Sequence, residues 1–318
     1  MADEDETREP GAGGRAGARA GMTDRAGRGT ILFVLLIGLL WGLNWPAVKF
    51  MLTEIPPITI RAVAFTLAAL MLVAVARALG HDLRPARRER VALAATGFFM
   101  VFGFNALTSL GQLLTETSKA AIIAYTMPAL TAGLAVVFLG ERLGARLIAA
   151  LALGMAGLVV LASESFAALA AAPLGPAIMF AAAFSWALGN IALKARAWTL
   201  SPLARTVWFF VVSALCCWAL VFAFEPPWRQ TWPSAPVLWT MVFHVLGPMV
   251  VCYALFTTLV GRMSATVAAL STLTAPVVGV VSSMVLLGDP VTWQKALSLT
   301  MVVASILMTL IPLPARRR

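Results

Sequence analysis

The chain has 318 residues, of which 60% are hydrophobic and only 12% charged, and its mean hydropathy is +0.89. A soluble domain carries about a quarter charged residues, so this composition excludes a water-soluble globular protein and predicts an all-α integral membrane protein. The net charge of +10 does not indicate a nucleic-acid partner. The basic residues lie at the ends of apolar runs and in the tails, where Lys and Arg indicate membrane topology.

Residues 1–28 differ from the rest of the chain. They are rich in Gly, Ala and Arg, begin with an acidic run and contain almost no bulky apolar side chain. A segment of this kind cannot bury enough apolar surface to order itself. We expect a disordered cytoplasmic tail, and the acidic start argues against a cleaved signal peptide.

Apolar runs follow the tail, and each is long enough to cross about 30 Å of hydrocarbon. The ten expected transmembrane helices are 30–49, 58–77, 91–113, 119–139, 146–163, 174–194, 203–224, 236–258, 265–287 and 294–311. Clusters of Pro and Gly separate several of them.

The second five spans repeat the first five. The motif from Trp41 to Lys49 returns 145 positions later, from Trp186 to Lys194. A second motif, at 125–128 and 140–141, returns 148 positions later at 273–276 and 288–289. Five is odd, so the second unit enters the membrane with opposite orientation. We therefore expect two inverted five-helix repeats, residues 29–165 and 172–312, as is typical of secondary transporters.

The distribution of Lys and Arg predicts the orientation. With the N-terminus inside, 19 of the 24 basic residues fall on the inner side and 5 on the outer side, among them Lys49 and Arg61. This bias predicts that both termini are cytoplasmic. The high Ala, Gly and Arg content is common in bacterial proteins, so the expected location is a bacterial inner membrane.

These motifs resemble the drug/metabolite transporter superfamily, and specifically its EamA family. The resemblance is carried by the run from Trp41 to Pro46, by Leu139-Gly140-Glu141 after Met127-Pro128, and by Leu287-Gly288-Asp289 after Ala275-Pro276. It implies a ten-helix fold, alternating access and export of small metabolites or amino acids. Asp289 stands where the family usually has Glu.

Polar side chains within hydrocarbon must find partners, so they face the bundle interior or a wet cavity. Candidate substrate-binding residues of the inner spans are Asn44, Trp45, Asn105, Tyr125, Asn190, Tyr253, Ser271 and Thr274. The alternative is that some only join helices by hydrogen bonds. Prolines interrupt the same spans and are candidate hinges, since each frees a backbone carbonyl: Pro46, Pro128, Pro248 and Pro276.

Three further candidates carry or acquire charge. Lys49 and Lys194 close the repeated motif and either extend to the interface or bind a substrate carboxylate or phosphate. His244, the histidine within a span, either relays a proton or bonds a neighbouring helix.

Each acidic residue after the tail falls at the end of a span or in a loop. A proton-coupled drug exporter needs a buried acid, so this alternative is disfavoured, and a channel-like facilitator is the other alternative. No catalytic, metal or cofactor motif is present, so we expect no enzyme. The expected partners are a small-molecule substrate and the lipid bilayer, and a monomer is compatible with the sequence.

Overall fold

A computed structural model describes residues 32–33, 35–140, 145–163, 172–259 and 265–310. The regular structure in these ranges consists of helices, with no strand among them, which confirms the all-α prediction. The tail expected at 1–28 lies outside the described residues.

The first part of the chain forms helix Leu35–Met51, followed by α2 (Pro57–Ala78), η1 (Arg87–Glu89), α3 (Arg90–Thr96), η2 (Gly97–Gly103), α4 (Phe104–Leu114), α5 (Thr117–Ala124), α6 (Met127–Leu139) and α7 (Ala145–Ala162). The second part forms α9 (Leu174–Lys194), α10 (Pro202–Phe224), η3 (Pro227–Arg229), α11 (Ala235–His244), η4 (Val245–Cys252), α12 (Tyr253–Leu259), α13 (Ala265–Leu287) and α14 (Trp293–Leu310).

Five helical runs in the described ranges are long and apolar enough to cross a membrane: α2, 87–114, α9, α10 and 235–256. Shorter apolar helices occupy Leu35–Met51, Ile148–Leu161 and Ala275–Leu287. The prediction of a multi-pass membrane protein is therefore confirmed.

Two of the expected spans contain π-helical turns, which the sequence pattern did not predict. These are η2, within the span expected at 91–113, and η4, within the span expected at 236–258. The two π segments begin 148 positions apart, the offset of the second sequence repeat. A π turn leaves backbone carbonyls outside the regular α-helical pattern and is frequent at functional sites. In η2, the carbonyl of Phe99 accepts a hydrogen bond of 2.8 Å from Ser185 Oγ.

The span expected at 119–139 is also divided. It forms α5 and α6, separated at Tyr125 and Thr126. Pro128 is the second residue of α6, and its missing N–H cannot bond the carbonyl of Ala124, so the break has a local cause. Its repeat partner, Pro276, lies inside the continuous helix α13.

The glycine of the Leu-Gly-acid motif ends a helix, and the acidic residue of its second copy accepts a hydrogen bond from the start of another helix. Gly140 and Gly288 follow α6 and α13 with φ values of 68° and 71°, a left-handed conformation that glycine adopts without strain. The next residue in the second copy, Asp289, accepts a hydrogen bond of 2.7 Å from the backbone N–H of Ser118, at the start of α5. The negative carboxylate suits this helix N-terminus.

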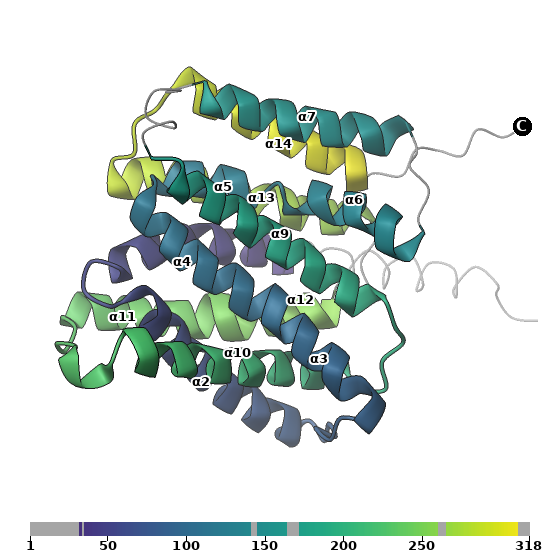
Figure 1. The fold of residues 1–318 in the computed structure, drawn as a ribbon, viewed down its shortest axis with the longest axis vertical. Coiled ribbons are helices and arrows are strands. Elements are labelled where there is room, and N and C mark those ends of the chain that lie inside the picture. The colour runs from purple at the N-terminus through teal and green to yellow at the C-terminus, as the bar shows by residue number, and fades with distance from the viewer. Residues whose placement is uncertain (1–31, 34, 141–144, 164–171, 260–264, 311–318) are drawn as a thin grey trace, which may run out of the picture.

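The helices pack mainly in pairs drawn from the two parts of the chain. Helix α7 packs against α14, α2 against α10, and α4 against α9. Figure 1 places the α7–α14 pair at one end of the long axis and the α2–α10 pair at the other, with α4 and α9 between them. In the first two pairs, each helix contacts its own counterpart in the repeat.

Two matched hydrogen-bonded contacts follow the 145-residue offset. Glu54 accepts bonds from the backbone N–H and hydroxyl of Ser234, at 2.6 and 2.7 Å. Glu89 accepts the same pair of bonds from Thr199, at 2.6 and 2.9 Å. Glu54 corresponds to Thr199 and Glu89 to Ser234, so the donor and the acceptor exchange between the two repeats. The contacts fasten the starts of α11 and α3 to loops from the other part of the chain.

Candidate functional site

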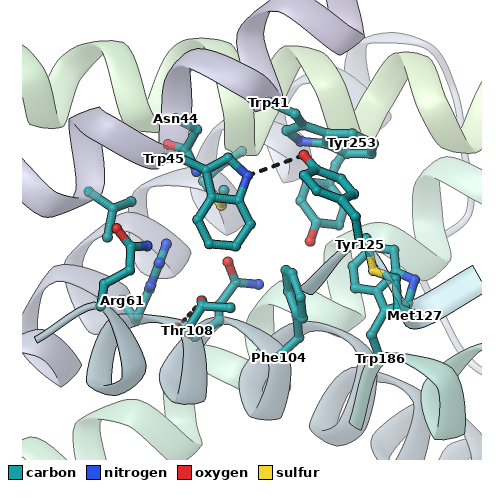
Figure 2. Close-up of a pocket in the computed structure, with 14 residues that line it drawn as sticks. Trp41, Asn44, Trp45, Arg61, Phe104, Thr108, Tyr125, Met127, Trp186 and Tyr253 are labelled. Carbon is teal, nitrogen blue, oxygen red and sulfur yellow. Dashed lines mark hydrogen bonds between the residues drawn. The ribbon is translucent and has the colours of Figure 1, made fainter. Parts of the chain in front are cut away.

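A cavity with about 590 Å³ of space free of atoms lies among helices from both parts of the chain. Its lining comes from helix Leu35–Met51, α2, α4, the α5–α6 break, α6, α9, η4 and α12, and consists of Trp41, Asn44, Trp45, Val48, Arg61, Phe104, Asn105, Thr108, Gln112, Tyr125, Met127, Trp186, Met249 and Tyr253. Figure 2 shows these side chains converging on the cavity.

Aromatic rings form a large part of the cavity wall, six of the fourteen lining residues. Trp45 donates a hydrogen bond of 3.2 Å from Nε1 to the hydroxyl of Tyr125, drawn in Figure 2. Phe104 and Trp186 contact each other edge to face, with ring centroids 5.0 Å apart. Trp41 donates to the carbonyl of Pro248 at 3.1 Å, so a π-segment carbonyl orients one of these rings. Such walls suit an apolar or aromatic portion of a ligand.

Arg61 is the cation in the cavity lining, and its side chain is almost fully buried. Its Nε donates to Ser109 Oγ at 2.7 Å, and Nη1 lies 3.2 Å from His244 Nε2. His244 Nδ1 lies 2.6 Å from Asn44 Oδ1. Arginine only donates hydrogen bonds, so His244 Nε2 must accept and its Nδ1–H donates to Asn44. The network requires a neutral His244 and fixes the guanidinium from two sides.

The lining contains no acidic residue. A carboxylate near the ends of α4 and α5 is instead paired: Glu116 forms an ion pair with the fully buried Lys295 and a second, of 3.2 Å, with Lys119. Partial burial raises the pKa of Glu116, but the hydrogen bond and charge of Lys295, helped by Lys119, hold this pKa below its usual value. Glu116 is therefore a charged structural partner at neutral pH.

The structure brings several predicted site residues to the cavity: Asn44, Trp45, Asn105, Tyr125 and Tyr253. Asn105 donates from Nδ2 to the carbonyl of Val101, in η2, at 2.8 Å. His244 lies outside the lining but bonds two lining residues, Asn44 and Arg61.

Other predicted residues lie elsewhere. Lys49 is half-buried and donates from Nζ to the backbone carbonyl of Gln112, without contributing to the lining. Asn190 donates to the carbonyl of Trp186, within α9, at 3.1 Å. Lys194 is exposed at the end of α9. The side chains of Ser271 and Thr274 lie outside the described residues.

The four hinge candidates have different surroundings. Pro46 lies in helix Leu35–Met51, Pro248 in the π segment η4 and Pro276 inside α13, whereas Pro128 follows the break between α5 and α6. Their role as hinges stays a prediction.

Sequence reasoning missed Arg61 as a site residue, because it treated this arginine as an outer-side charge. Its position in the sequence could have indicated a buried, functional charge, because Arg61 lies one turn inside an apolar helix that starts at Pro57. Trp41 and Trp186 head the two copies of the repeated motif, and both line the cavity. Because they occupy matching positions in the repeat, the sequence could have predicted that both contribute aromatic rings to one site.

Comparison with known proteins identifies the family of these features. The sequence model of the EamA-like transporter family matches residues 28–163 and 173–311, which confirms the resemblance found from the motifs. An "Uncharacterized transporter YvbV" from Bacillus subtilis (strain 168) is 25% identical over 281 residues, covering 87% of this chain and 90% of that protein. A "Probable amino-acid metabolite efflux pump" from Escherichia coli (strain K12) is 26% identical over 306 residues, covering 90% and 96% of the two chains.

A solved crystal structure has the same fold. It superposes with a TM-score of 0.65, covering 88% of this chain and 96% of the other chain, at 22% identity. An identity this low shows the shared fold alone.

Proposed function

The chain belongs to the EamA-like transporter family, and from this premise we propose that it is a secondary carrier exporting small metabolites, amino acids among them, by alternating access. The observation that carries this proposal is the cavity between the two parts of the chain, lined by side chains from both. A substrate site at the interface between repeats is typical of secondary transporters. The amino-acid assignment is supported by the printed name of the Escherichia coli relative.

Several observations support a ten-span architecture of two inverted five-helix repeats. One family model matches the chain twice. The π segments η2 and η4 recur 148 positions apart, and α2 and α7 pack against their repeat counterparts α10 and α14. Because five spans per repeat reverse the direction of the second copy, a carrier of this kind can exchange an inward-facing and an outward-facing arrangement around one central site.

The orientation and location belong to the same proposal. The excess of Lys and Arg on one side supports cytoplasmic termini in a bacterial inner membrane. The partners in this proposal are a small-molecule substrate and the lipid bilayer, and a monomer is compatible with it.

The test is transport by purified protein reconstituted into liposomes. Radiolabelled amino acids, added outside vesicles loaded with the same unlabelled compound, should accumulate transiently by exchange. Trp186→Ala removes one aromatic ring from the cavity wall and should lower the rate of exchange. The control Trp232→Ala removes an exposed ring outside the cavity and should leave this rate unchanged. Absence of exchange across a broad panel of amino acids and organic anions would refute the carrier proposal. Conductance in planar bilayers far above carrier turnover would instead indicate a channel.

A further inference from the structure

Arg61 places a buried positive charge at the wall of the cavity. Its side chain is 1% exposed, and among the described residues no ion pair or hydrogen bond joins it to a carboxylate. A buried charge is costly unless it is paired, and ionisable groups inside membrane proteins commonly face a functional cavity. The network around Arg61 contains only neutral groups, so its charge is not balanced by the protein there.

The guanidinium retains donors for a ligand. Of its five N–H groups, one bonds Ser109 and one bonds His244. No hydrogen bond of Nη2 is found within the described part of the chain. Because Ser109 and His244 fix the plane of the group, its remaining donors are oriented before a ligand arrives. A fixed, planar pair of N–H donors matches the two oxygens of a carboxylate.

Gln112 offers an acceptor in the same cavity as Arg61. Its Oε1 is buried and has no hydrogen-bond partner, and the residue lines the cavity. Gln112 follows Thr108, another lining residue, by four positions on α4, which is about one helical turn. A buried acceptor without a partner is unfavourable, so a ligand N–H group would remove this penalty. Figure 2 shows Arg61 on the opposite side of the view from Met127 and Trp186.

We propose that Arg61 binds the carboxylate of a zwitterionic substrate, with the ammonium of the substrate donating to Gln112 Oε1 and its apolar side chain lying against the aromatic wall. The proposal rests on the carrier function above and narrows its substrate class to amino acids with a large apolar or aromatic side chain. Arg61 then acts as a specificity-determining residue, and His244 and Asn44 act through it as positioning residues.

Three probes of equal apolar body separate the two polar contacts. These are L-phenylalanine, L-phenylalaninamide, which lacks the carboxylate, and 3-phenylpropanoate, which lacks the ammonium. Binding to purified full-length protein is measured by the fluorescence of its tryptophans, some of which line the cavity. Arg61→Gln should weaken L-phenylalanine and 3-phenylpropanoate about 10- to 100-fold and leave the amide unchanged or tighter. Gln112→Leu should weaken only the two probes that carry an ammonium.

Two further variants keep the test decisive. Arg229→Gln, an exposed arginine outside the cavity, should match the wild type with each probe. Arg61→Lys keeps the charge but loses the planar pair of donors, so its carboxylate preference should fall between wild type and Arg61→Gln. The ratio of carboxylate to amide affinity does not depend on the folded fraction, so partial misfolding cannot imitate the effect.

The outcomes distinguish this proposal from the carrier function. Equal weakening of all three probes by Arg61→Gln would show that Arg61 only joins helices, and would overturn the proposal while wild-type exchange still stood. Failure of all three probes to bind the wild type would also overturn the substrate class, and liposome exchange of other metabolites would then decide the carrier function separately.

Discussion

Helix α9 approaches the π segment η2 so closely that Gly189 should not tolerate a side chain. A Cβ atom added at Gly189 would lie 2.4 Å from Met100 Cβ, 2.5 Å from its backbone N and 2.7 Å from its Cα. Favourable carbon–carbon contacts lie at about 3.5–4.0 Å, so α9 and η2 would have to separate by about 1 Å. Two of the three atoms belong to the backbone, and a change of rotamer cannot move them.

The magnitude follows from two opposing terms. Overpacking typically costs about 1–3 kcal/mol, and a clash with backbone atoms belongs in the upper part of that range. Alanine in a helix gains about 0.8–1 kcal/mol over glycine. We therefore expect Gly189→Ala to lower the free energy of unfolding by about 1–2 kcal/mol. Trp186 lies one turn earlier on α9 and lines the cavity, so transport should fall too.

The matched control is Gly247→Ala. Its added Cβ would meet Leu40 Cδ2 at 3.3 Å, the end of a flexible side chain that can move aside. Melting temperatures of both variants in the same detergent, measured with exchange in liposomes, provide the comparison. Gly189→Ala should melt several degrees below the wild type, and Gly247→Ala close to it. If Gly189→Ala melts and transports as the wild type does, the close approach of α9 and η2 is incorrect.

Further predictions concern charge and topology. Two hydrogen bonds from Ser234 hold the pKa of Glu54 below its usual value of 4.5, so their stabilisation is present above that pH and is lost as the pH falls through the lowered pKa. The melting temperature of Glu54→Gln should lack this acid-dependent decrease, and an identical decrease in both proteins would contradict the assignment. Cysteines introduced at 80–88 should react with impermeant reagents only from the cytoplasm, and those at 226–235 only from outside; a reversed pattern at either site would disprove the proposed orientation. Lys194→Gln should transport as the wild type does, because Lys194 is exposed. Lys49→Gln should lose about 1 kcal/mol of stability with its hydrogen bond to the Gln112 carbonyl, and equal melting of these two variants would contradict that difference.

Sequence patterns predicted the helical, multi-pass class and the transporter family correctly, because both depend on properties read along the chain. The hydropathy of a span is a sum over consecutive residues, and the repeated motifs keep fixed offsets. The glycines of the Leu-Gly-acid motif likewise occupy the left-handed ends of α6 and α13, a conformation that glycine tolerates intrinsically.

Those patterns could not predict the helical register, that is, the direction in which each side chain points from its helix. The sequence predicted one span through η2 and one through η4, the latter with Pro248 as a hinge, but it did not predict the π turns. A π turn adds a residue per turn and rotates each later side chain. Ser185, on another helix, donates to the carbonyl of Phe99 in η2. Trp41 does the same for Pro248 in η4. Such partners come from distant parts of the chain, so local propensity could not predict them.

By itself, the sequence determined that the chain is a helical membrane transporter with polar residues in its inner spans. Only the tertiary structure decided which of them meet at one cavity. Successive residues on a helix differ by about 100° in direction, so Lys49, five positions after Asn44, points about 140° away from it around the helix axis. Asn44 lines the cavity and Lys49 does not. Only the packing of α2 against α4 and α11 identifies Arg61 as a site residue. The hydrogen bonds that orient its guanidinium come from Ser109 on α4 and His244 on α11.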